Sequence, residues 1–294
     1  PGGVRPVIDA RGATTGRGLC SAGAAECMVG AAHCPKTTRL CGKLTPAFSA
    51  CSWCPTPLGR YHAAMSDTKV SPKCAAELRP VRSFVKRQGR LTVGQRRALD
   101  ELWPQFGVDY ADTVVDMEGL FGRQAPVTLE IGIGNGANLL AMAAAQPAHD
   151  FLGIEVHEPG VGHCLLGIES AAITNIRLLQ HDAIEVLTNM LAPASLARAN
   201  LFFPDPWPKK RHHKRRIVQP DFLELLASRL AIGGIFHVAT DWANYAEHIA
   251  ASQRQHPQFV ALPEPPAYRT VSRFDARGQR LGHRNWEQAW RRRG

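Results

Sequence analysis

The chain has 294 residues, a formal net charge of +10 and a sequence pI of about 9.5. This length fits one large α/β domain with an appendage, or two small domains. The charge favours a nucleic acid or an anionic membrane surface as partner. No stretch reaches the roughly 18 uninterrupted apolar residues of a membrane span, so we expect no membrane association.

Residues 1–64 differ in composition from the rest of the chain. They are rich in Gly, Ala, Cys, Pro and Thr and hold no segment that could bury a core, so they are predicted to be disordered or to precede the true start. Cys51 and Cys54 form a C-x-x-C pair, but the irregular spacing of the surrounding cysteines does not supply four zinc ligands, and no metal site is predicted. The cysteine pattern favours a reducing compartment, and we expect the protein in the cytoplasm.

Residues 65–125 are predicted to form a basic arm ahead of the main domain. Arginines recur among apolar residues between positions 78 and 122. Thr92 is a suitable N-cap for a short helix over 95–102, which should stop near Pro104. The arm is either a surface for RNA phosphates or a solvated lead-in.

Strand-like and helix-like runs alternate from residue 126 to the end of the chain. The strand-like runs are 127–131, 151–156, 176–181, 200–203, 235–240, 259–262 and 286–290. The helix-like runs between them are 137–145, 162–172, 184–191, 221–230 and 242–252. This alternation predicts an α/β fold for 126–294: a doubly wound, mostly parallel, seven-stranded Rossmann-like sheet with helices on both faces.

A glycine-rich turn follows the first of these strands. Residues 129–136 read LEIGIGNG, and Gly132, Gly134 and Gly136 permit a tight turn and the close approach of a ligand to the backbone. The pattern also fits a dinucleotide site. However, Glu130 would repel a pyrophosphate and attract the ammonium or sulfonium group of S-adenosylmethionine. S-adenosylmethionine is therefore favoured over NAD.

Acidic residues end the next two strands, at the edge where open α/β sheets bind ligands. Glu155 can accept hydrogen bonds from ribose hydroxyls, and Asp182 can accept one from an adenine amino group. Each has an alternative role as a helix N-cap or a solvated loop carboxylate. Their recurrence at successive strand ends favours the cofactor site.

Residues 201–216, LFFPDPWPKKRHHKRR, join an apolar strand, one carboxylate, a proline-rich turn and a block of cations. Asp205 lies at the predicted strand end, and Lys209 and the cations after it suit a polyanionic substrate. Trp207 either stacks on an exposed base or packs against the sheet edge. Asp241 ends the following strand and is a base acceptor or a helix cap.

Taken together, these motifs resemble the bacterial tRNA (guanine-N7-)-methyltransferase family of class I methyltransferases. The matching stretches are LEIGIGNG, FLGIEVH, NIRLLQHDA, LFFPDPWPKKRHHKRR, VATDW and SRFDARGQRLGH. The resemblance implies methyl transfer from S-adenosylmethionine to N7 of a guanosine in the tRNA variable loop, at position 46. It implies tRNA as partner and no obligate protein partner.

The resemblance also implies a role for each matched residue. The cofactor contacts would be Glu130, Gly132, Gly134, Gly136, Glu155, Asp182 and Asp205. The substrate contacts would be Lys209, Asp241, Ser272, Arg273, Phe274 and Asp275. The family often has Thr-Lys-Phe-Glu where this chain has Ser-Arg-Phe-Asp, a chemically similar set. Asp205 would be the catalytic residue, because guanine N7 has no proton to lose and its methylation leaves a cationic ring that a carboxylate stabilises.

Two alternatives remain open on the sequence. The first is a class I methyltransferase with another acceptor, which the basic run and arm disfavour. The second is an RNA-binding protein with a non-catalytic cofactor pocket, which the complete set of glycines and strand-end acids disfavours.

Overall fold

The computed structural model describes residues 81–85, 89–270, 280, 282 and 284–294. The chain divides into two units, Pro1–Ser71 and Pro72–Gly294, and the described residues all belong to the second. The predictions for residues 1–64, with Cys51 and Cys54, therefore lie outside the described residues. Within the described part, no helix is both long and apolar enough to cross a membrane.

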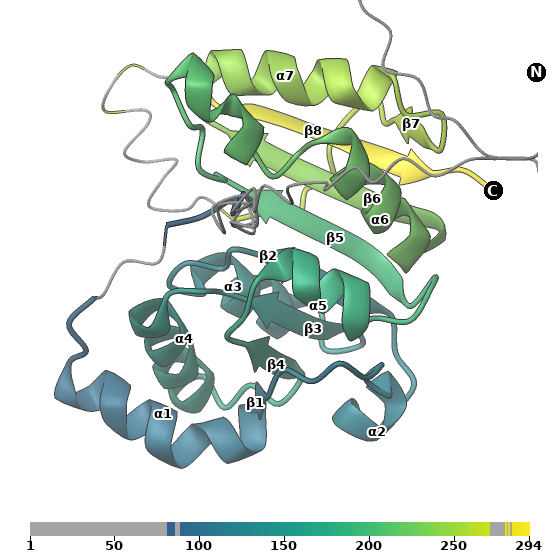
Figure 1. The fold of residues 1–294 in the computed structure, drawn as a ribbon. Helices are drawn as coiled ribbons and strands as arrows, with labels where there is room; N and C mark the ends of the chain where they lie inside the picture. Colours follow the sequence, from purple (N-terminus) through teal and green to yellow (C-terminus); the bar gives the residue numbers. More distant parts are fainter. Residues whose placement is uncertain (1–80, 86–88, 271–279, 281, 283) are drawn as a thin grey trace, which may run out of the picture. The chain divides into compact units, whose positions relative to one another are not determined.

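An eight-stranded sheet with the order β1-β4-β3-β2-β5-β6-β8-β7 forms the centre of the second unit (Figure 1). The strands are β1 (Gly107–Val108), β2 (Val127–Ile131), β3 (Asp150–Ile154), β4 (Ile176–Leu179), β5 (Leu196–Phe202), β6 (Leu230–Thr240), β7 (Phe259–Ala261) and β8 (Trp286–Arg292). All neighbours are parallel except β8, which runs antiparallel to β6 and β7. The predicted mostly parallel sheet is confirmed. Its seven predicted strands are all present, and β1 is an additional two-residue edge strand that the sequence pattern did not indicate.

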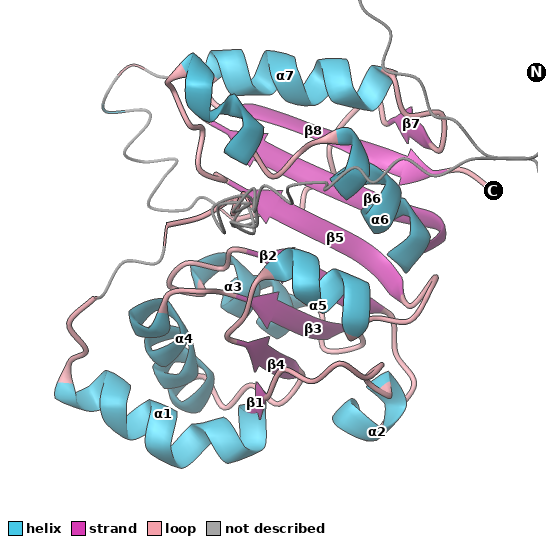
Figure 2. Cartoon of the chain, in the orientation of Figure 1, coloured by secondary structure: helices cyan, strands magenta, loops and turns pink. Residues whose placement is uncertain are grey.

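Helices pack on both faces of the sheet (Figure 2). They are α1 (Val93–Phe106), α2 (Met117–Phe121), α3 (Ala137–Ala145), α4 (Glu158–Ser170), α5 (Ala183–Asn189), α6 (Pro220–Arg229) and α7 (Ala243–Arg254), with the 3-10 helix η2 (Lys210–Arg215) before α6. One hydrophobic core joins the sheet to α5, α6 and α7, and a second joins it to α1, α3 and α4. Because strands of a parallel sheet are buried on both sides, every residue of β2 and β3 is buried, including the polar Thr128 and Glu130 of β2.

Helix α1 begins as predicted but does not stop where expected. Thr92 and Gln95 form a capping box, in which each side chain accepts a hydrogen bond from the other residue's backbone N–H. The predicted stop near Pro104 is wrong, because the helix continues through the proline to Phe106. Ala98 and Phe106 are buried in the core shared with α4. This packing offsets the backbone hydrogen bond that the proline lacks.

The parallel register places the functional candidates at one edge of the sheet. Ile131 pairs with Ile154 on one side and with Leu201 on the other, and Phe202 pairs with Ala239. The segments that follow β2, β3, β4, β5 and β6 therefore leave the sheet at its carboxyl edge. Ligands of open α/β sheets bind at this edge.

Candidate functional site

The glycine turn after β2 has a backbone that only glycine adopts without strain. Gly132, Gly134 and Gly136 have φ angles of 73°, 59° and 80°. A Cβ on Gly136 would also lie 2.4 Å from the Cys164 sulfur. The turn is fixed to the neighbouring strand, since the Gly132 N–H donates to the Ile154 carbonyl at 2.8 Å. The turn thus leaves its backbone uncovered by side chains at the three glycines.

Glu155 fastens this turn to the start of α4. Its carboxylate accepts hydrogen bonds from the backbone N–H groups of Gly134 at 2.8 Å, Val156 at 2.8 Å and His157 at 2.9 Å. An ionised carboxylate has about four acceptor positions. Glu155 therefore retains capacity for a ribose hydroxyl while it holds the turn.

Glu130 lies within β2, and only 2% of it is exposed. Its Oε2 atom has no hydrogen-bond partner among the described residues. Burial raises the pKa of this carboxyl to about 8. The Cys164 thiol from α4 and the Tyr268 hydroxyl from the segment after β7 interact with it electrostatically. Neither group is a cation, so Glu130 is a buried carboxyl suited to a cationic ligand.

Asp182 is the N-cap of α5, where its side chain accepts the Ile184 N–H at 3.0 Å. The helix-cap alternative is therefore realised, and this cap leaves a second oxygen outside the capping bond. Asp182 also lines a cavity of about 410 Å³ between η2 and the first turns of α5 and α6. The cavity has apolar walls that include Ile184 and Phe222, and cations on its rim that include Arg82 and Lys214. It brings a predicted cofactor residue next to the basic segment.

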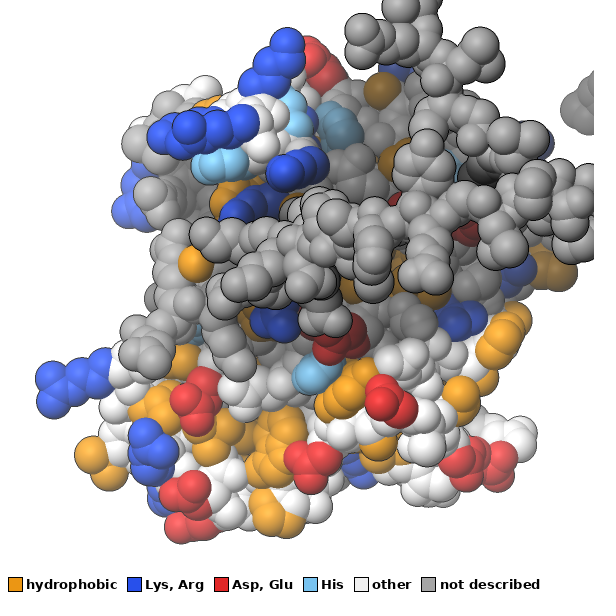
Figure 3. All heavy atoms as spheres, in the orientation of Figure 1, with side chains coloured by type: hydrophobic (Ala, Val, Ile, Leu, Met, Phe, Trp, Pro, Cys, Tyr) orange, Lys and Arg blue, Asp and Glu red, His pale blue; other side chains and the backbone are white. Residues whose placement is uncertain are grey.

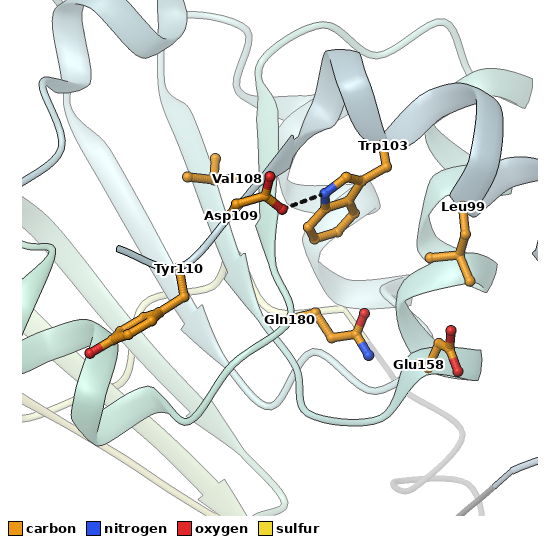
Figure 4. A pocket seen from close by; sticks show the side chains of 7 residues that line it. All are labelled: Leu99, Trp103, Val108, Asp109, Tyr110, Glu158 and Gln180. Atoms are coloured by element: carbon orange, nitrogen blue, oxygen red, sulfur yellow. Dashed lines mark hydrogen bonds between the residues drawn. The ribbon is translucent and has the colours of Figure 1, made fainter. Parts of the chain in front are cut away.

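A second cavity, of about 290 Å³, lies between α1, β1 and the end of β4 (Figure 4). Its lining side chains are those of Leu99, Trp103, Val108, Asp109, Tyr110, Glu158 and Gln180. The indole N–H of Trp103 donates to Asp109 at 2.9 Å, and both residues line the cavity (Figure 4). None of the predicted site residues lines it, whereas Asp182 lines the larger cavity.

The turn that carries Asp205 has a strained backbone on both sides of the carboxylate. Phe203 and Trp207 have φ angles of 52° and 46°, in the left-handed region that bulky residues avoid. Asp205 itself is exposed. The Trp207 indole N–H donates to the Ser83 carbonyl at 3.0 Å, and the Arg215 guanidinium lies 4.9 Å from the centroid of the ring. Trp207 thus packs within the protein, between the arm and η2.

The basic segment divides into exposed and buried cations. Lys209, Lys210, Arg211 and Lys214 are exposed. Figure 3 shows Lys, Arg and His side chains gathered at the upper left of this face. Arg216, by contrast, is only 2% exposed. The sequence-based expectation that all the cations after Lys209 suit a polyanionic substrate therefore does not extend to Arg216.

The remaining substrate candidates are placed only in part. Asp241 follows β6 and is half-buried, and the N-cap of α7 is Trp242, not Asp241. The helix-cap alternative for Asp241 is therefore wrong. The predicted residues Ser272, Arg273, Phe274 and Asp275 lie outside the described residues.

Two anchors just before that segment were missed by the sequence analysis. The Tyr268 hydroxyl donates to Asn200 Oδ1 at 3.0 Å, and the Thr270 hydroxyl donates to Asn138 Oδ1 at 2.6 Å. Asn138 lies in the first turn of α3, directly after the glycine turn. The two partners of the second bond are 132 positions apart, and no local pattern signals such a contact.

The family match and the curated relatives agree on one enzyme class. Residues 124–288 match the family described as "Putative methyltransferase". A tRNA (guanine-N(7)-)-methyltransferase from Sodalis glossinidius is 53% identical over 232 residues, covering 76% of this chain and 97% of that protein. One from Aeromonas hydrophila is 52% identical over 221 residues, covering 73% and 93%. A solved rRNA methylase from Streptococcus thermophilus shares 13% identity with a TM-score of 0.42, covering 58% and 88%.

Proposed function

The chain belongs to the tRNA (guanine-N(7)-)-methyltransferase family, and we propose that the residues gathered at the carboxyl edge of its sheet perform that family's reaction. The enzyme transfers the methyl group of S-adenosylmethionine to N7 of a guanosine in tRNA. The observation that carries the assignment of residues is the pairing of β2 with β5. This pairing sets the glycine turn beside the turn of Asp205, so a cofactor on one turn faces a base on the other.

The glycine turn and the acids around it fit S-adenosylmethionine. The glycines of the turn, which adopt positive φ angles, let a ligand approach the backbone closely, and Glu155 retains acceptor capacity. The unpartnered oxygen of Glu130 suits a ligand that carries an ammonium and a sulfonium group and no phosphate. We assign Glu130, Glu155 and Asp182 to the cofactor, which supplies an electrophilic methyl group when bound.

The chemical step needs placement and charge stabilisation rather than proton transfer. Guanine N7 attacks with a lone pair, so no general base is required, and the protein must hold the ring in line with the methyl group. Methylation leaves the ring positively charged. We assign Asp205 to stabilise this developing charge, or to accept hydrogen bonds from guanine N1–H and the 2-amino group. Both roles need an ionised carboxylate.

The exposed cations of the basic segment supply the affinity for tRNA. Lys209, Lys210, Arg211 and Lys214 are exposed beside the Asp205 turn. Contacts of Lys and Arg with phosphates provide the part of the affinity that does not depend on sequence. We propose that Lys209, Asp241 and the segment Ser272, Arg273, Phe274 and Asp275 orient the guanosine. We further propose that it lies at variable-loop position 46, and that the enzyme acts in the cytoplasm without an obligate protein partner.

The acceptor is tested with tRNA transcripts that differ at one nucleotide. The unmodified transcript should accept one labelled methyl group per molecule, and a transcript with adenosine at position 46 should accept none. A transcript with guanosine changed to adenosine elsewhere in the variable loop is the matched control and should remain a substrate. Equal labelling of all three transcripts would contradict the assigned position, while no labelling of any would contradict the proposed acceptor.

A further inference from the structure

We propose that Arg216 is a positioning residue for methyl transfer, which holds the turn of Asp205 in place and makes no contact with RNA. The proposal rests on the proposed role of Asp205. Arg216 would thus differ in role from the exposed cations that precede it in the same basic run, because its buried guanidinium would act on the protein's own backbone.

The side chain of Arg216 joins the turn to helix α7. Its Nε–H donates to the Pro206 carbonyl at 3.0 Å, directly after Asp205 in the chain. Its Nη2 group donates to Asn244 Oδ1 at 2.7 Å, on the first turn of α7. The guanidinium also lies 4.9 Å from the centroid of the Tyr245 ring, which is fully buried. One planar group therefore links the turn, the helix and the core.

The turn needs such a link because its conformation is strained. Phe203 and Trp207 both have positive φ angles, and each unfavourable backbone conformation of this kind persists only where the surroundings determine it. Three prolines, at positions 204, 206 and 208, restrict the turn but donate no backbone hydrogen bonds. The Pro206 carbonyl, directly after Asp205 in the chain, is fixed by the Arg216 side chain.

A guanidinium is suited to this position and an ammonium is not. Arg216 uses Nε toward the turn and Nη2 toward both α7 and His213 Nε2, at 3.2 Å, so its hydrogen bonds leave the same rigid plane in different directions. A lysine offers one charged nitrogen on a flexible stem and cannot reproduce that fork. Lysine at this position should therefore restore the function only in part.

The test compares Arg216→Ala and Arg216→Lys with Arg229→Ala in methyl transfer to tRNA. Arg229 is the matched control, because its guanidinium also clamps carbonyls, those of Leu187 at 2.6 Å and Thr188 at 3.1 Å. It precedes β6, at the opposite edge of the sheet from Asp205. Asn244→Ala is the second variant, because it removes the hydrogen-bond acceptor on α7 and leaves the Arg216 guanidinium in place.

Arg216→Ala should lower kcat roughly 30-fold, with the KM for tRNA and the Kd for the cofactor product unchanged within about threefold, because the lost placement acts on the chemical step. Asn244→Ala and Arg216→Lys should give smaller losses of the same kind, and added guanidinium ion should restore part of the kcat of Arg216→Ala. Arg229→Ala should leave kcat unchanged. A raised KM with an unchanged kcat would overturn the proposal and make Arg216 an RNA contact.

A second readout does not depend on activity. Backbone hydrogen exchange in the peptide that contains Asp205 and Trp207 should be faster in Arg216→Ala than in the wild type, and unchanged in Arg229→Ala. Equal exchange in all three proteins would overturn the clamp. If the wild type failed to methylate tRNA, the proposed function would fall, while the exchange comparison would still decide whether Arg216 holds the turn.

Discussion

The two halves of the site are held in place by different means. The cofactor half is made from regular structure: β2, a glycine turn and α3, with Glu155 bonded to the backbone at its centre. The substrate half is an irregular segment in which side chains fix the backbone, Arg216 to Pro206 and Trp207 to Ser83. Substitutions in the first half should therefore act through backbone conformation and burial. Those in the second half should act through the loss of individual side-chain tethers.

The sharpest test of the cofactor half compares two of its glycines. Gly136→Ala and Gly132→Ala both impose a left-handed φ on alanine, which costs about 1 kcal/mol. Only at Gly136 would the new Cβ meet the Cys164 sulfur, at 2.4 Å, and overpacking of this kind adds about 1–3 kcal/mol. Urea unfolding of the cofactor-free proteins should show the larger loss for Gly136→Ala. Equal losses would mean that α4 shifts to make room.

Burial in the cofactor half also predicts a dependence on pH. The pKa of Glu130 is raised to about 8 in the fold from an ordinary value of 4.5, so the folded protein binds a proton that the unfolded chain releases. The resulting stability is fully present below about pH 4.5 and is lost as pH rises through about 8. Thermal melts without cofactor should show this loss in the wild type and a flatter profile in Glu130→Gln.

Glu247→Gln, at an exposed position of α7, serves as the control for these melts. A wild-type slope in Glu130→Gln would assign the pH dependence to another group. Because a cationic ligand favours the ionised carboxylate, binding of S-adenosylmethionine near pH 7 should also release about one proton. Calorimetry in buffers of different ionisation enthalpy measures this number, which should fall to near zero in Glu130→Gln.

The hydrogen bond between Thr270 and Asn138 joins the segment before the predicted substrate residues to the cofactor half, and its loss should have a smaller effect. Thr270→Val removes the hydroxyl that donates to Asn138 and keeps the shape of the side chain. Loss of one partly buried hydrogen bond of about 1 kcal/mol corresponds to roughly a fivefold change in equilibrium. We expect the KM for tRNA to rise by about that factor while cofactor affinity stays constant. A change confined to cofactor affinity would show that the bond supports α3 alone.

The smallest effect is expected at the rim of the substrate half. Lys214 is exposed and borders the larger cavity, so Lys214→Ala should weaken tRNA binding a few-fold. Its signature is the salt dependence, since loss of one phosphate contact reduces the slope of log K against log salt by about 1. Arg254, exposed in the last turn of α7, supplies a same-charge control. An unchanged slope in Lys214→Ala would place that side chain outside the interface.

The same contrast explains what the sequence could and could not predict. The glycine turn and the acids Glu155 and Asp182 follow apolar strands, and a parallel sheet must bring such strand ends to one edge. Their placement therefore followed from periodicity alone. The role of Arg216 did not, because a run of cations looks uniform in sequence although Lys214 is exposed and Arg216 is buried.

Long-range tethers and tertiary packing account for the other differences. The bond between Trp207 and Ser83 spans 124 positions, so no local pattern could predict it. By local rules α1 should end near Pro104. The helix continues to Phe106 because burial of that side chain stabilises the last turn. Residues placed by strand geometry were predictable, whereas residues placed by side-chain partners far along the chain were not.

The most direct test of the account is single-turnover methyl transfer to tRNA by the wild type and Asp205→Asn, at saturating cofactor and RNA. Borohydride and aniline then cleave the product wherever N7-methylguanosine has formed. We predict one cleavage site in the variable loop for the wild type. Asp205→Asn should cleave at the same site after a transfer roughly 100 to 1,000 times slower, since it keeps the shape of the carboxylate and loses its charge. A rate equal to that of the wild type would contradict the assignment of Asp205 to the reaction.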